Sequence, residues 1–162
     1  MWTLKNLFAI GGLENVGFAP GQDKLIVLSS QGQGIFDCNT GEKIARKHDG
    51  ADWWNSFNEP SGSIPGFDCL EGLIITTHGL YGDDNLPKST TDGWTLSISK
   101  PEPDDKPFEK YLIQKIHLIS PDKEQKIFIA KDGACEFRAF GFSETGKSFI
   151  VASSCDLIIY SR

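Results

Sequence analysis

The chain has 162 residues, a hydrophobic fraction of 39% and a formal net charge of −6 at pH 7. A chain of this length buries a core without stapling and fits one domain spanning residues 1–162, and its composition excludes disordered and fibrous proteins. The apolar run from Leu7 to Ile10 is too short for a secretory core or a membrane span, so we expect a cytoplasmic protein.

The charge is unevenly distributed. Residues 1–47 carry five Lys/Arg and four Asp/Glu, net +1, and residues 110–162 carry eight and six, net +2, whereas residues 48–109 carry three and twelve, net −9. Nucleic-acid binding depends on neutralising phosphates with Lys and Arg, so this pattern argues against direct binding of nucleic acid and favours a basic partner. The alternative is that the middle segment is a solvated acidic face that aids solubility.

The two ends of the chain contain an internal repeat. At an offset of 124, residues 17–38 align without a gap with residues 141–162, and seven of the 22 positions are identical. Each copy predicts a short strand ending in Gly-Phe, a polar turn, an apolar strand (Lys24–Leu28 or Phe149–Ala152), a Ser-Ser pair and a further strand (Gly34–Asp37 or Leu157–Tyr160).

The apolar strands of the repeat do not alternate between apolar and polar residues. Leu25 to Leu28 are all apolar, as are Phe149 to Ala152. Both faces of these strands must therefore be covered, which predicts stacked sheets rather than one sheet with a wet face. Because matching units stack well, we also expect the two ends of the chain to meet in the fold.

The stretch "GFAPGQDKLIVLSSQGQGIFDCNTGEKIA" (residues 17–45) resembles three strands of a WD-type β-propeller blade. In "IFDCNTGEK" a strand ends in Asp, an Asn-Thr-Gly turn follows, and a last strand begins at Lys43, as in that blade pattern. The Trp-Asp and Gly-His signatures of the family do not occur at the matching places, so the resemblance implies the blade architecture rather than membership of the family.

The stretch "DGADWWNSFNEP" follows these strands and places two tryptophans between carboxylates. Neighbouring strand residues point to opposite faces, so Trp53 and Trp54 are both core only if both faces are covered or if the segment is a loop. In the functional interpretation one ring packs under the sheet, and the other lies on a surface rimmed by Asp49, Asp52 and Glu59. Such an aromatic anchor among carboxylates fits a basic protein partner.

The remaining strands are predicted at 71–80, 92–99, 111–119, 126–130 and 135–140, which gives about eleven or twelve in total. We therefore expect an all-β fold whose antiparallel sheets stack as a small propeller-like or sandwich domain. A fragment that oligomerises is a third interpretation of the same pattern.

Few residues point to chemistry. The four cysteines have no metal-ligand spacing and no disulfide framework, so we expect reduced thiols, no metal and no cofactor. The three histidines lack metal-binding spacing, and neither serine pair lies in a Gly-x-Ser-x-Gly motif, so we expect no catalytic residues and no enzyme activity.

The whole chain resembles the single-domain immunity proteins encoded beside bacterial toxins of contact-dependent growth inhibition and related polymorphic toxin systems. The stretches "LKNLFAIGGLENVGFAP", "LSSQGQGIFDCNTGEKIAR" and "ADWWNSFNEP" carry this resemblance. It implies that the protein acts in the cytoplasm as an antitoxin and masks the active site of a cognate toxin C-terminal domain, often a basic nuclease. The partner contacts that we expect are Asp49, Asp52, Trp53, Glu59, Tyr81, Asp83 and Asp84, with Asp104 and Asp105 as weaker candidates.

Two other functions fit the sequence. One is a propeller-type protein-interaction scaffold that is not linked to a toxin. The other is a small hydrolase that uses His78 with Asp83 or Asp84.

Overall fold

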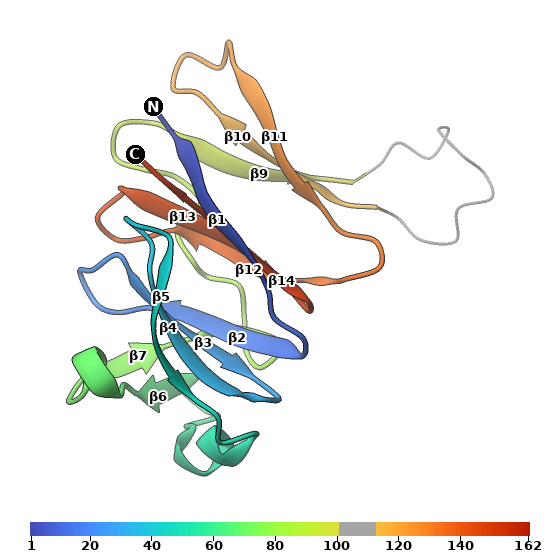
Figure 1. The fold of residues 1–162 in the computed structure, drawn as a ribbon. Helices are drawn as coiled ribbons and strands as arrows, with labels where there is room; N and C mark the ends of the chain where they lie inside the picture. Colours follow the sequence, from blue (N-terminus) through green and yellow to red (C-terminus); the bar gives the residue numbers. More distant parts are fainter. Residues whose placement is uncertain (101–112) are drawn as a thin grey trace.

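The chain forms an all-β fold of four antiparallel sheets (Figure 1). The computed structural model describes residues 1–100 and 113–162, and within them fourteen strands and two short 3-10 helices occur. The prediction of stacked antiparallel sheets is confirmed. The prediction missed β1 (Thr3–Ala9), because most of its residues are exposed, and β6 (Ser63–Pro65), because it is short. It also merged two strands into one within residues 71–80.

The largest sheet has the strand order β5-β4-β3-β2-β8. Its strands are β2 (Leu13–Phe18), β3 (Lys24–Ser29), β4 (Gly32–Asp37), β5 (Glu42–Lys47) and the two-residue β8 (His78–Gly79). A second sheet has the order β1-β14-β13-β12 and contains β12 (Phe137–Phe142), β13 (Ser148–Ser153) and β14 (Asp156–Ser161). Consecutive strands pair in both sheets, except where β1 and β8 join from elsewhere in the chain.

Two smaller sheets complete the fold. One has the order β11-β10-β9, formed by β9 (Thr95–Ser99), β10 (Lys115–Ile119) and β11 (Lys126–Lys131), and the other pairs β6 with β7 (Ile74–Thr76). The helices η1 (Asp52–Ser56) and η2 (Asp68–Leu70) flank β6 along the chain.

The four sheets lie in a row (Figure 1). Strands β9–β11 cover one face of the β12–β14 sheet, the β2–β5 sheet covers its other face, and β6–β7 lie beyond. The side chains of β3 show this layering: Leu25 and Val27 pack toward the β12–β14 sheet, whereas Ile26 and Leu28 pack toward Trp53 and the β6–β7 end. Both faces of the repeat strands are covered, as their continuous apolar sequence predicts.

The internal repeat is also a structural repeat. At the same offset of 124, the bounds of β2, β3 and β4 coincide with those of β12, β13 and β14. The irregularity between Leu13 and Asn15 in the β2–β3 pair recurs between Phe137 and Ala139 in the β12–β13 pair. A conserved register across the two copies indicates one structural unit used twice.

The fourth strand of each copy comes from a different place in the chain. In the first copy, β5 follows β4 and pairs with it, whereas in the second copy the N-terminal strand β1 pairs with β14. The registers match: Asp37 opposes Glu42 in the first copy and Ser161 opposes Thr3 in the second. The two ends of the chain therefore meet, as the repeat predicts, and the N-terminal strand completes the C-terminal sheet.

Residues 76–88, which we call the crossing segment, connect the two copies at their inner edges. Its strand β8 pairs with β2, where Asn15 opposes Gly79, and further along the segment Pro87 O accepts a hydrogen bond of 2.8 Å from Phe142 N on β12. The segment therefore fills the unpaired edges of β2 and β12 in turn, which satisfies backbone groups that the two sheets leave open.

One expectation about cysteine is wrong. Cys135 and Cys155 form a disulfide, with their Cα atoms 6.0 Å apart. Pairing of β12 with β13 sets Phe137 opposite Ser153, and this register brings the start of β12 beside the turn between β13 and β14. Sequence spacing does not reveal such a pair, because the contact depends on the strand register. Cys38 is buried and reduced and Cys69 is exposed and reduced, as expected.

Candidate functional site

The two adjacent tryptophans have different environments. They lie in the 3-10 helix η1, so they do not project to opposite faces of a strand. Trp53 is only 3% exposed, packs in the core against β3 and β4, and donates a hydrogen bond of 2.8 Å from Nε1 to Ser29 O. Trp54 is 38% exposed. The surface ring is therefore Trp54, and the expectation that Trp53 contacts a partner is corrected.

Trp54 belongs to an aromatic patch that we define as Trp54, Phe57 and Tyr81. The rings of Trp54 and Phe57 stack with their centroids 5.3 Å apart, and the Tyr81 ring lies 4.7 Å from that of Trp54. Buried Trp53 packs edge-on against Trp54 at 5.7 Å. The exposed ring is therefore supported by three other aromatic rings, which fixes its orientation without covering it.

The patch lies in an acidic part of the chain. Residues 48–72 contain no Lys or Arg and five carboxylates: Asp49, Asp52, Glu59, Asp68 and Glu71. All of these except Asp49 are exposed. Asp52 begins the helix that carries Trp54, and Glu59 follows Phe57 by two residues. Asp52 and Glu59 are therefore exposed and close in sequence to the exposed Trp54 ring.

Asp49 is half-buried and partly engaged. Its Oδ2 accepts a hydrogen bond of 3.2 Å from Gln33 Nε2. Its Oδ1 and the Oε1 of Gln33 are both buried without a hydrogen-bond partner in the described parts of the chain. This hydrogen bond links the residues after β5 to β4, and Asp49 is less exposed to solvent than Asp52.

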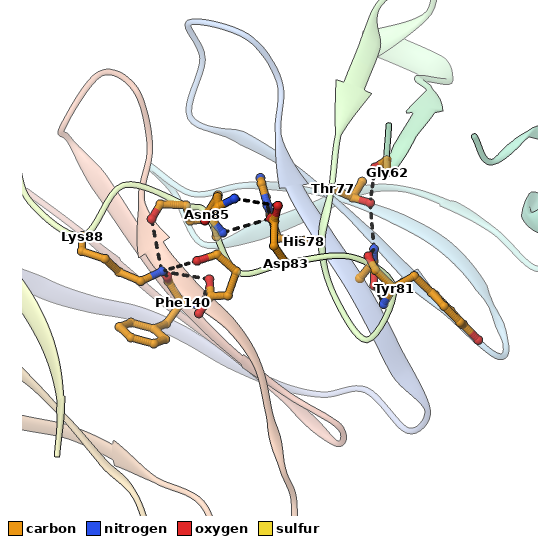
Figure 2. A network of polar contacts seen from close by, with 11 residues as sticks. Gly62, Thr77, His78, Tyr81, Asp83, Asn85, Lys88 and Phe140 are labelled. Carbon is orange, nitrogen blue, oxygen red and sulfur yellow. Dashed lines mark hydrogen bonds and ion pairs between the residues drawn. The ribbon is translucent and has the colours of Figure 1, made fainter. Parts of the chain in front are cut away.

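Tyr81 is held by a buried amide (Figure 2). Asn15 is fully buried, and its Oδ1 accepts a hydrogen bond of 3.0 Å from Tyr81 N while its Nδ2 donates to Tyr81 O and to Thr77 Oγ1, both at 2.9 Å. Thr77 Oγ1 in turn donates to Gly62 O at 2.7 Å. This chain of bonds links β2, the crossing segment and the start of β6, so it fixes the backbone beneath one ring of the aromatic patch.

Asp83 forms a pair with a histidine (Figure 2). Its Oδ1 lies 2.8 Å from His78 Nδ1, and Asn85 Nδ2 donates a hydrogen bond of 2.6 Å to its Oδ2. The hydrogen bond from His78 is the main reason that the pKa of the Asp83 carboxyl is lowered from its usual value. Asp83 is exposed, yet both of its carboxylate oxygens already accept hydrogen bonds within the crossing segment.

Asp84 is bound to a lysine that acts as a structural clamp (Figure 2). Lys88 Nζ lies 2.9 Å from Asp84 Oδ1, 3.1 Å from Leu86 O and 2.6 Å from Phe140 O, and 4.2 Å from the centroid of the Phe140 ring. Asp84 Oδ1 also accepts a hydrogen bond of 3.3 Å from Phe140 N. These contacts attach the crossing segment to β12 and occupy the carboxylate that the sequence suggested for a partner.

The structure thus brings together only part of the predicted contact set. Tyr81 joins the aromatic patch, Asp52 and Glu59 lie in the same acidic segment, and Asp83 and Asp84 serve the crossing segment. Asp104 and Asp105 lie outside the described residues. The exposed ring, Trp54, was not among the predicted contacts, because the sequence alone does not show which of two adjacent rings a 3-10 helix buries.

A cavity of about 280 Å³ lies beside the crossing segment. His78 and Asn85 of the crossing segment line this cavity. Its other walls include Phe18 at the end of β2, Phe142 at the end of β12, Thr76 and Glu144. The His78–Asp83 pair of the hydrolase interpretation therefore exists beside a cavity. None of the lining residues is a serine or a cysteine, and in residues 1–100 and 113–162 no cluster of three metal-ligating side chains occurs.

No protein-family model and no curated protein matches the chain. Among the described helices, none is long and apolar enough to cross a membrane.

Proposed function

We propose that this protein binds a basic protein and neutralises it, and that the binding surface is the aromatic patch with the carboxylates of residues 48–72. A single observation carries the proposal: Trp54 is exposed and packs against other aromatic rings, of which Trp53 is buried, in a segment that has five carboxylates and no Lys or Arg. Aromatic anchors inside a charged rim are the usual composition of protein-binding hot spots.

The arrangement suits a partner that normally binds phosphate. A nuclease collects Lys and Arg to hold its substrate, and carboxylates positioned there compete with RNA or DNA for the same groups. The exposed Asp52 and Glu59 would accelerate encounter, whereas the Trp54 ring would slow release once it is desolvated. The partner that fits is therefore the basic toxin domain implied by the resemblance to immunity proteins.

Neutralisation of such a toxin takes place in the cytoplasm, where thiols are kept reduced. The Cys135–Cys155 disulfide joins strands that are already paired through β12, β13 and β14. The proposal therefore requires that the reduced protein stay folded and bind as well as the oxidised one.

The test is co-expression with the product of the neighbouring gene. The protein is expected to co-purify with that product and to restore growth to cells that express it. Trp54→Ser is expected to abolish both effects, whereas Leu7→Ser, which alters an exposed apolar side chain on β1, is expected to preserve both. Full protection by the folded Trp54→Ser variant would overturn the assignment of the surface, and absence of any complex would overturn the function.

A hydrolase is the second candidate, because His78 and Asp83 lie 2.8 Å apart beside the cavity. It predicts activity against a panel of ester and phosphoester substrates that His78→Ala abolishes. A protein-interaction scaffold is the third, and it predicts capture of several partners that share no toxin domain.

A further inference from the structure

The sheet formed by β9–β11 has one covered face and one open face. Leu96, Ile116 and Leu118 are buried against the β12–β14 sheet. The alternate residues of β10 point the other way, where no further sheet of the described chain lies (Figure 1). This outward face is one end of the row of four sheets.

The open face carries basic and aromatic side chains. On it, Lys115 opposes Lys131 and His117 opposes Phe128, and Lys126 opposes Ile119. We define the basic face as Lys115, His117, Lys126, Phe128 and Lys131. Phe128 is 53% exposed, and its ring lies 5.9 Å from that of His117. The three strands contain no Asp or Glu.

Two features of the basic face remain uncompensated within the described chain. Like charges directly opposite one another on a sheet are destabilising, and Lys115 and Lys131 form such a pair. Burial and the nearby Lys126 and Lys115 lower the pKa of His117, and its Nδ1 is buried with no hydrogen-bond partner in the described residues. A surface that brings carboxylates and an aromatic ring would offset the repulsion between the two lysines and would cover the exposed Phe128 ring.

The opposite end of the row offers such a surface. Helix η1 and strands β6–β7 lie at the far end from β9–β11 (Figure 1). There Trp54 is exposed, and so are four carboxylates, Asp52, Glu59, Asp68 and Glu71. The basic group found beside them is Lys47, whose Nζ lies 5.0 Å from the centroid of the Phe67 ring, so carboxylates outnumber it at this end. The two ends of one molecule are therefore complementary in charge, and both expose an aromatic ring.

We propose that the basic face of one molecule binds the acidic aromatic end of a second copy of this chain. Within the molecule, neighbouring sheets cover each other's facing sides, and the contact between copies would continue this stacking across the two end faces. Because the two surfaces differ, the contact is heterologous and leaves a free end of each kind, so assembly proceeds beyond a dimer.

A second copy fits this face better than a nucleic acid does. Lysines and aromatic rings on an antiparallel sheet also suit single-stranded nucleic acid. The whole chain, however, has a net charge of −6, which opposes the approach of a polyanion. The inference does not depend on the proposed toxin partner, although such a partner would compete for the acidic end.

Sedimentation velocity of this 162-residue protein tests the proposal. The mean mass is expected to rise with protein concentration at low salt and to fall toward the monomer as salt is added, because screening acts over about 8 Å at physiological ionic strength. One variant, Lys126→Gln with Phe128→Ser, blocks the basic face. A second variant, Asp52→Asn with Trp54→Ser, blocks the acidic end.

Each blocked variant is expected to be monomeric alone, with association weakened about tenfold or more. Their mixture retains one intact surface of each kind, so it is expected to form a one-to-one dimer and nothing larger. Lys147→Gln with Leu7→Ser, which alters an exposed Lys and an exposed Leu elsewhere, is expected to assemble like the wild type. Circular dichroism confirms that each variant is folded.

Three results would overturn the proposal. The first is a wild-type protein that stays monomeric at low salt and high concentration. The second is assembly of either folded, blocked variant as readily as the wild type. The third is tight binding of a fluorescent single-stranded oligonucleotide by the basic face of a monomer. Loss of toxin binding alone would count against the proposed function and not against this contact.

Discussion

Gly17 and Gly141 hold the same position in the two copies of the repeat, and each allows the crossing segment to pass against the inner strand of its sheet. A Cβ added to Gly17 would collide with the backbone oxygen of Thr76, and a Cβ added to Gly141 would collide with Leu86 and lie 2.8 Å from Pro87 O. The identity of these two glycines therefore reflects one packing requirement that is met twice, by different parts of one segment.

Replacing either glycine with alanine is expected to destabilise the protein by about 1–3 kcal/mol, because overpacking forces backbone shifts. Urea denaturation followed by tryptophan fluorescence measures the loss. Gly11→Ala is the matched control, since a Cβ there meets only Gln31 Nε2, at 3.7 Å. Unchanged stability of both repeat variants would show that the crossing segment does not pack as described.

Because β1, the fourth strand of the second copy, comes from the other end of the chain, we expect a circular permutant that joins the two ends to fold. In the first copy, four residues (38–41) connect Asp37 to its partner Glu42. Between Ser161 and its partner Thr3, one inserted Gly together with Arg162, Met1 and Trp2 would give a connection of the same length. A chain that starts at Gly12 and ends at Gly11 is therefore expected to fold with strands β14 and β1 as a hairpin.

Circular dichroism and thermal melting check the permutant against the wild type. A control that carries the same Gly linker and has β1 deleted is expected to be strongly destabilised, because β14 then loses one of its two partners. A permutant that is unfolded while the β1-deleted control is folded would contradict the pairing of β1 with β14.

Lys88 is expected to matter more for stability than an exposed lysine normally does. Lys88→Met keeps the aliphatic stem but removes the charged group that binds Asp84, Leu86 O and Phe140 O. Hydrogen bonds to charged groups contribute about 1.5–3 kcal/mol each, and because the Lys88–Asp84 pair is partly exposed, the free energy of unfolding is expected to fall by about that amount in total. Lys147→Met, an exposed control, is expected to change it by less than about 0.5 kcal/mol.

Asp84→Asn is expected to behave like Lys88→Met and to leave partner binding of the folded protein unchanged. A normal melting temperature for both variants, together with loss of binding for Asp84→Asn, would restore Asp84 as a partner contact.

Much of the fold follows from local sequence. Continuous apolar runs such as Leu25 to Leu28 require cover on both faces, and the repeat requires two similar units, so stacked sheets are predictable. Strand β1 was not predictable from the sequence, since most of its residues are exposed and its pairing partner lies at the other end of the chain. Edge strands of this kind carry a weak hydrophobic pattern, which is why the sequence does not reveal them.

The candidate site was only partly predictable for a different reason. The sequence indicates an aromatic and acidic segment, yet the choice between Trp53 and Trp54 depends on the turn that η1 makes. Likewise, the clustered charges of Asp83 and Asp84 suggest a binding surface, but tertiary contacts with His78 and Lys88 occupy them. The disulfide between Cys135 and Cys155 depends on strand register in the same way.

The disulfide is expected to stabilise the fold without being required for it. Cys135 and Cys155 are separated by 20 residues, and closing a loop of about that length contributes roughly 3 kcal/mol in the chain-entropy account. The Cys135→Ser, Cys155→Ser variant is therefore expected to melt at a lower temperature and to retain its sheets, whereas Cys69→Ser, at an exposed position, is expected to melt like the wild type. An unfolded double variant would exclude action in a reducing cytoplasm.

The kinetics of binding to the product of the neighbouring gene test the central claim, that the acidic aromatic surface recognises a basic protein. Asp52→Asn with Glu59→Gln is expected to slow association and to flatten its salt dependence, whereas Trp54→Ser is expected mainly to speed dissociation. Glu124→Gln, an exposed carboxylate on the β10–β11 turn, is expected to leave both rates unchanged. Wild-type association and dissociation rates for the folded Asp52/Glu59 and Trp54 variants at every salt concentration would contradict the claim.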